Sequence, residues 1–205
     1  MQPNPVTLMK HLISIFSATF LLLTFCKAQD KTDSTVFYNK EFKWRITIPV
    51  GFDTISSAEM AILQNRGKVA LEKTAGRKVK DNTKKLCVFR SGQSNSFECS
   101  TQPYEVKKQG SYIKTCDEVN KLLYKTFELQ MPGVKIDSSC STIVVNGLTF
   151  QSFNLAATLP NQITLHVYTY SRLFEKREFA VSIIAIDREK EKQLLNAWLN
   201  SKFEK

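Results

Sequence analysis

The chain contains 205 residues, of which 42% are hydrophobic, and its 29 Lys and Arg residues outnumber 19 Asp and Glu residues to give a formal net charge of +10. This length is sufficient for one domain that buries a hydrophobic core of its own. The two histidines, His11 and His166, are too few for a His-rich metal centre or for a relay of several histidines, so the composition excludes both.

The first 28 residues have the pattern of an export signal. Lys10 precedes an apolar run over residues 12–25, and Cys26 and Ala28 place small side chains at the positions that a signal peptidase inspects. The run of 14 residues is shorter than the about 20 that a membrane-spanning helix needs, so we expect no transmembrane span. We predict export to the periplasm or the extracellular space with cleavage after Ala28. The mature chain then keeps 27 basic and 19 acidic residues, a net charge of +8.

Cys26 also suggests an alternative, because a lipidated cysteine of a bacterial lipoprotein follows an apolar run in the same way. Phe25 is too large for the position directly before such a cysteine, which favours simple secretion. The sequence leaves the lipidation of Cys26 open, and the intact mass of the mature protein distinguishes the two.

We expect a polar lead-in over residues 29–35, followed by a single domain over residues 36–205. The first strand is predicted over Phe42–Ile48, where apolar and polar residues alternate up to Pro49. Its core-facing residues are Phe42, Trp44, Ile46 and Ile48.

Two capping boxes predict the starts of two helices. Ser56 with Glu59 begins the first, in which Gly67 weakens the helical pattern, and Thr115 with Glu118 begins the second. The apolar residues expected on one face of the second helix are Val119, Leu122, Leu123 and Phe127.

The four cysteines of the mature chain predict two disulfides in an oxidising compartment. Residues 85–90 and 97–102 flank a turn-rich stretch, so Cys87 and Cys99 are expected to face each other across a hairpin. A helix that rises from Cys116 and a strand that returns to Cys140 have similar lengths, which pairs these two. The alternatives are the other two pairings or four free thiols.

The last third of the chain predicts a meander of four antiparallel strands and a closing helix. Asn146-Gly147 is a strong hairpin signal between the first two strands, over residues 134–145 and 148–157. Two further strands follow over residues 163–173 and 178–186, and Asp187 is placed to cap the last helix. The expected fold is α+β, an antiparallel sheet with helices on both faces (an α/β/α sandwich) in the order β-α-ββ-α-ββββ-α.

This order of elements, with two segments, resembles the PsbP-like superfamily. The segment from Trp44 to Phe52 is similar to the early strand, proline, short turn and aromatic residue of these proteins, and the closing helix over Ala197–Phe203 is similar to theirs. The superfamily includes the PsbP subunit of photosystem II, periplasmic DcrB-type proteins and a nuclear Ran-binding relative. The resemblance covers residues 36–203 and implies an accessory or binding role more than catalysis.

The sequence contains little that indicates catalysis. We find no GxSxG, HExxH or phosphate-binding glycine-rich loop, and no CxxC spacing for zinc, so we expect no metal, no cofactor and no catalytic residue. His166, Tyr168 and Tyr170 alternate onto one strand face and are the candidate face for a small ligand. A hydrolase-like pair of His166 with Ser152 or Ser182 is the enzymatic alternative.

A basic segment between residues 66 and 90 is the main functional signal. Its residues are Arg66, Lys68, Lys73, Arg77, Lys78, Lys80, Lys84, Lys85 and Arg90. Such a segment attracts an anionic partner, which in an exported protein is an envelope protein or an anionic surface and not a nucleic acid. We therefore expect a non-enzymatic accessory or binding protein of the cell envelope that uses a sheet edge or this segment. The sequence leaves its oligomeric state undetermined.

Overall fold

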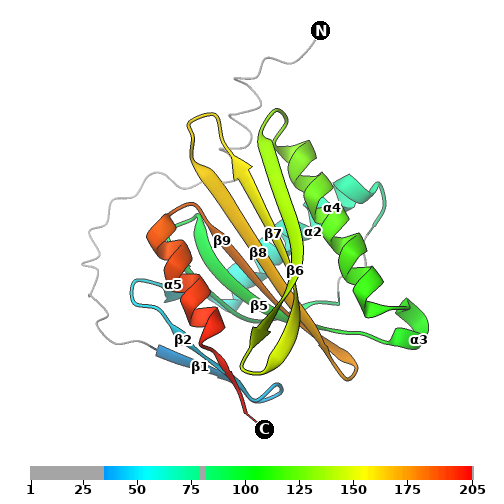
Figure 1. The fold of residues 1–205 in the computed structure, drawn as a ribbon, viewed down its shortest axis with the longest axis vertical. Helices are drawn as coiled ribbons and strands as arrows, with labels where there is room; N and C mark the ends of the chain where they lie inside the picture. The colour runs from blue at the N-terminus through cyan, green and yellow to red at the C-terminus, as the bar shows by residue number, and fades with distance from the viewer. Residues whose placement is uncertain (1–34, 79–81, 205) are drawn as a thin grey trace. The chain divides into compact units, whose positions relative to one another are not determined.

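The computed structural model describes residues 35–78 and 82–204, so the predicted signal, Cys26 and Lys80 lie outside the described residues. Within this part of the chain, two antiparallel sheets pack with helices (Figure 1). The smaller sheet has three strands in the order β1-β2-β10. Its strands are β1 (Thr35–Asn39), β2 (Trp44–Ile48) and β10 (Lys202–Phe203).

The larger sheet has seven strands in the order β3-β4-β5-β9-β8-β7-β6. Its first three strands in the chain are β3 (Asp53–Thr54), β4 (Lys84–Ser91) and β5 (Asn95–Pro103). The meander supplies β6 (Lys135–Val145), β7 (Leu148–Thr158), β8 (Thr164–Phe174) and β9 (Arg177–Ala185). All neighbouring strands are antiparallel.

Helices cover both faces of the larger sheet. The helices are α2 (Ser57–Ala75), α3 (Val106–Gln109), α4 (Tyr112–Gln130) and α5 (Arg188–Leu199). Cys116 of α4 contacts Ser171 of β8, whereas the next residue back, Tyr170, stacks on Trp198 of α5. Because adjacent residues of a strand point to opposite faces, α4 and α5 lie on opposite sides of the sheet. The predicted α+β sandwich is confirmed.

The main core lies between the two sheets and beneath α5. Trp44 of β2 and Trp198 of α5 are both fully buried, with ring centroids 6.5 Å apart in an edge-to-face arrangement. Phe179 of β9 packs on both, at 5.1 Å from Trp44 and 6.3 Å from Trp198. Aromatic pairs of this kind contribute beyond the area they bury. The smaller sheet, α5 and the larger sheet are therefore joined through one aromatic cluster.

The meander follows the sequence pattern closely. Asn146 and Gly147 adopt φ of +49° and +78°, the positive values that a two-residue hairpin turn requires, and Val145 pairs with Leu148. The capping box of Ser56 and Glu59 is present, and Asp187 accepts hydrogen bonds from two amides of α5. The helix begun at Ser56 continues past Gly67 and ends at Gly76, where φ is +64°.

The predicted capping box at Thr115 is wrong. Helix α4 begins one turn earlier, after Ser111, and the hydroxyl of Thr115 lies 2.8 Å from that of Tyr104. Tyr112 joins the helix and packs edge-on against Tyr104 at 5.2 Å. The Thr115 hydroxyl, which the local pattern assigned to a helix cap, is thus hydrogen-bonded to Tyr104 instead. Val119, expected on the apolar face, is 55% exposed.

Several short elements have no signal in the sequence pattern. Strand β1 begins at Thr35, inside the expected lead-in, and β10 pairs with β2 although the two lie at opposite ends of the domain. Helix α3 and strand β3 are also additional. Short strands are stabilised mainly by their long-range partners, which a local pattern does not contain.

We expect Trp198→Ala to lower the free energy of unfolding by about 3–5 kcal/mol, because it leaves a cavity between the two sheets. Denaturant unfolding followed by circular dichroism measures this change. Leu199→Ala is the matched control on the same helix, since Leu199 is 49% exposed, and should stay within about 0.5 kcal/mol of the wild type. Equal losses in the two variants would contradict the central role of the Trp198 ring.

Candidate functional site

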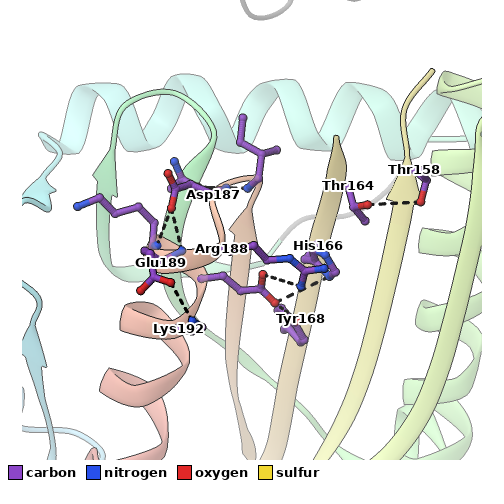
Figure 2. Close-up of polar contacts among 12 residues, drawn as sticks. Thr158, Thr164, His166, Tyr168, Asp187, Arg188, Glu189 and Lys192 are labelled. Carbon is purple, nitrogen blue, oxygen red and sulfur yellow. Dashed lines mark hydrogen bonds and ion pairs between the residues drawn. The ribbon is translucent and has the colours of Figure 1, made fainter. Parts of the chain in front are cut away.

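The predicted ligand face on β8 is divided between the core and the surface. Tyr170 is buried and stacks on Trp198 with ring centroids 5.6 Å apart, so no ligand reaches it. Tyr168 and His166 lie nearer the start of β8, beside the first turn of α5 (Figure 2). Helix α5 therefore covers one end of the face and leaves the other end open.

The first turn of α5 places a buried carboxylate, Glu191, against this face. The Tyr168 hydroxyl donates to Glu191 Oε1, and Arg188 Nη1 donates to Oε2 at 3.3 Å (Figure 2). His166 Nδ1 lies 3.9 Å from Oε1. A buried carboxylate is costly unless it is hydrogen-bonded, and these partners provide the compensation.

Glu191 is not among the residues that the sequence predicts for this face, although the sequence contains a signal for it. Glu191, Leu194 and Trp198 follow one another at the i, i+3 and i+7 spacing of one helical face. All three are buried in the structure. A carboxylate on an apolar stripe indicates a buried hydrogen-bonding partner on the surface beneath, which here is Tyr168.

Burial keeps the titratable groups of this face in their neutral forms. It lowers the pKa of His166, an effect that Glu191 opposes and Arg188 increases. Burial and the hydrogen bond to Glu191 raise the pKa of Tyr168 far above its ordinary value, and burial raises the pKa of Tyr170 to about 12. At neutral pH the face thus carries a neutral imidazole and two neutral phenols.

The hydrolase-like pairs of His166 with a serine are not assembled. Ser182 pairs with Thr169, whose neighbour Tyr170 faces α5, so Ser182 lies on the opposite face of the sheet from His166. Ser152 is opposite Tyr170, four residues along the strand from His166, a separation of about 13 Å. Neither hydroxyl can give its proton to the imidazole.

A shallow depression of about 300 Å³ remains at the open end of the face. Asp137, Ser139, Asn154, His166 and Tyr168 contribute to its lining. His166 Nε2 is buried and has no hydrogen-bond partner within the described part of the chain. The groups can hydrogen-bond a small polar molecule, and no cluster of three or more metal-ligating side chains occurs among residues 35–78 and 82–204.

The basic segment is partly neutralised by ion pairs. Lys68 pairs with Glu72 at 3.9 Å, Arg90 with Glu59 at 2.9 Å, and Lys85 with Glu98. The other described members are exposed and have no carboxylate within ion-pair distance in the described ranges. We call these five residues the basic surface: Arg66, Lys73, Arg77, Lys78 and Lys84.

The basic surface occupies one side of α2 and the chain that returns along it. Arg66 and Lys73 are seven residues apart and so lie on the same helix face. Within α2, the Gln64 side-chain amide donates to the carbonyl of Thr83 at 2.9 Å, which holds the start of β4 beside the helix. Lys84 follows Thr83 directly and therefore lies near the N-terminal half of α2.

The four cysteines are free thiols in the structure. Cys87 and Cys99 are directly opposite in the β4–β5 ladder, so the predicted register is confirmed while the bond stays a prediction. Cys116 and Cys140 are likewise not bonded in the structure, and their disulfide also stays a prediction. Cys116 contacts the hydroxyl of Ser171 at 3.6 Å, and Cys140 receives the amide of Asn120, one helical turn after Cys116, at 3.7 Å.

No helix in the described part of the chain is long and apolar enough to cross a membrane.

No protein-family model and no curated protein sequence matches the chain. Among solved structures, cyanobacterial PsbP (CyanoP) from Synechocystis sp. PCC 6803 is similar over 89% of this chain and 99% of that one, with a TM-score of 0.54 and 8% identity. The Saccharomyces cerevisiae Ran-binding protein Mog1p is similar over 83% of this chain and 95% of that one, with a TM-score of 0.42 and 10% identity. The likeness to cyanobacterial PsbP confirms the PsbP-like resemblance at the level of the fold.

We expect the stability of the protein to fall as the pH decreases below about 6.5, in part through His166. Its native pKa is lowered, so in this pH range the unfolded chain binds a proton that the native chain resists. Thermal unfolding at pH 7.5 and pH 5 should show a smaller fall in Tm for His166→Gln than for the wild type. Identical falls in the two proteins would contradict the buried neutral imidazole.

We also expect Cys87 and Cys99 to be recovered in one disulfide-linked peptide when the oxidised protein is digested without reduction. Directly opposite residues have Cα atoms about 4.5–5.5 Å apart, within the range of a disulfide. Burial and the neighbouring Cys87 thiol raise the pKa of Cys99, so the reactive thiolate is scarce in the native state and the bond should form during folding. A linkage of Cys87 to Cys116 or Cys140 would contradict the register.

Proposed function

We propose that this chain is an exported, non-enzymatic binding protein of the cell envelope that holds an anionic partner on its basic surface. The observation that carries the proposal is the set of five exposed cations on α2, on the segment after it and at the start of β4, none of which has a carboxylate within ion-pair distance in the described ranges. The leader pattern of residues 1–28 supports export. The separation of His166 from Ser152 and Ser182 supports a role other than hydrolysis.

The positive potential comes from the cations that have no carboxylate partner within the described ranges. Lys68, Lys85 and Arg90 each face a carboxylate, so their charges largely cancel at the surface. The basic surface has no such compensation in the described ranges, and its charges add to a mature net charge of +8. A concentrated positive potential raises the local concentration of anions and speeds their association. Its effect extends about 10 Å at 0.1 M salt and is screened at higher ionic strength.

The depression at His166 supports a second candidate function, the binding of a small polar ligand. Its specific observation is the depression of about 300 Å³ that His166, Asn154 and Asp137 help to line. A ligand that hydrogen-bonds the polar side chains there would increase the thermal stability of the protein. Loss of that increase in both His166→Gln and Asn154→Ala would identify the depression as its site.

We expect the triple variant Lys73→Glu, Arg77→Glu, Lys78→Glu to bind its anionic partner at least about tenfold more weakly than the wild type. Each Lys or Arg near an anionic surface contributes about 1 kcal/mol, and the variant also adds repulsion. Two measurements test it: flotation with phosphatidylglycerol vesicles against neutral phosphatidylcholine vesicles, and affinity capture from the envelope fraction. Vesicle binding identifies a lipid surface, and capture alone identifies an anionic macromolecule.

The matched control carries the same change in net charge on other exposed segments, through Lys40→Glu, Lys107→Glu and Lys176→Glu. If the basic surface is the binding site, this control retains most of the binding. Equal losses in the two triple variants would show that only net charge matters. Binding by the wild type that persists in 1 M salt, where the screening length is about 3 Å, would also contradict the proposal.

A further inference from the structure

Strand β6 forms a long, uncovered edge of the larger sheet. It ends the strand order and pairs only with β7 within the described part of the chain (Figure 1). All six residues from Asp137 to Thr142 are exposed, and the apolar Val144 is 65% exposed. An exposed edge presents unpaired main-chain N–H and C=O groups that can bond another strand.

This edge lacks the features that usually protect edge strands. Strand β6 contains no proline, and its register with β7 is continuous from Lys135 to Val145 without a bulge. Its two charged residues, Lys135 and Asp137, form an ion pair with each other at 3.2 Å. The remaining residues up to Val145 are uncharged. The edge is therefore suited to accept a further strand.

The turn at Asn146-Gly147 determines which main-chain groups point outward. In a two-residue hairpin the flanking residues, here Val145 and Leu148, form a hydrogen-bonded pair. Hydrogen-bonded positions alternate along an antiparallel ladder, so the odd-numbered residues of β6 bond to β7. The residues whose N–H and C=O point to the free edge are Ile136, Ser138, Cys140, Thr142 and Val144.

We propose that the occupant of this edge is a second copy of the chain, with the two β6 strands antiparallel about a two-fold axis at Cys140. Cys140 is the middle residue of β6, so this register overlaps the full strand. Each outward-pointing residue then meets an outward-pointing residue of the second copy, as a hydrogen-bonded ladder requires. The two sheets become continuous, and α4 stays on the same face in both copies because the axis is perpendicular to the sheet.

The side chains of β6 are self-complementary in this register. The exposed Val144 meets Ile136 of the second copy twice by symmetry, which buries apolar surface on the α4 side of the sheet. Asp137 and Lys135 lie opposite the apolar residues at positions 143 and 145, so no like charges face each other. This match between the two halves of the strand favours a second copy as the occupant.

The first test compares Thr142→Pro with Thr142→Val by sedimentation equilibrium. Proline removes an outward N–H and leaves the odd-numbered bonds to β7 in place, so the fold should be kept. By symmetry two inter-copy hydrogen bonds are lost, and we expect the dimer Kd to rise at least about tenfold. Valine keeps the N–H and should leave Kd within about threefold of the wild type. Circular dichroism confirms folding of both variants.

The second test places charges on the proposed axis. Cys140→Lys and Cys140→Asp should each be monomeric alone, because like charges then face each other, and should form a heterodimer when mixed. Cys140→Ala is the control and should dimerise as the wild type does. A wild-type protein that stays monomeric at high concentration, or lysine and aspartate variants that each dimerise alone, would overturn the proposal. So would a wild-type monomer that instead binds an unrelated extended peptide at β6.

Discussion

The contact between Trp198 of α5 and Trp44 of β2 holds the smaller sheet and α5 together on one face of the larger sheet. The two rings meet edge-to-face between the sheets, and Phe179 of β9 packs on both of them. Neither indole N–H has a hydrogen-bond partner within the described residues, so each carries a desolvation cost of about 1–3 kcal/mol. The apolar and aromatic packing around the two rings must exceed that cost, which explains why so many large side chains gather at this point.

The position of α5 that follows from this contact also decides what the His166 face can do. With Trp198 anchored over Tyr170, the first turn of the helix brings Glu191 onto Tyr168 and close to His166. The polar groups of the strand are then used mainly to compensate a buried carboxylate. Tyr168 thus has a structural role on this face, and the depression at His166 is what remains of the predicted ligand face.

Those outer surfaces have different physical characters. The basic surface acts at a distance through charge and is sensitive to salt, whereas the β6 edge acts at contact through main-chain hydrogen bonds and apolar pairs. The two proposed functions, self-association at the edge and attraction of an anionic partner by the basic surface, are compatible with each other. Strand β6 and the basic residues of α2 lie on separate elements, so the two functions can be altered independently by substitution.

Local patterns predicted most of the fold, and their failures have identifiable causes. The meander, the Asn146-Gly147 turn and the opposition of Cys87 and Cys99 follow from alternation and turn chemistry over a few neighbouring residues. The prediction of a capping box at Thr115 was wrong because the Thr115 hydroxyl hydrogen-bonds Tyr104. Tyr104 lies outside the four-residue window of a capping box but is adjacent in space. Strands β1 and β10 were missed because they depend on pairing with β2.

The same distinction applies to the candidate sites. The sequence by itself determined the alternation that puts His166, Tyr168 and Tyr170 on one face, the concentration of positive charge between residues 66 and 90, and the order of elements, because each depends on neighbours along the chain. Only the tertiary structure decided that Glu191 occupies that face, that three of the basic residues are paired, and that β6 has a neighbouring strand on one side only within the described residues. These outcomes depend on which distant segments meet, and contacts between distant segments leave no periodic trace in the sequence.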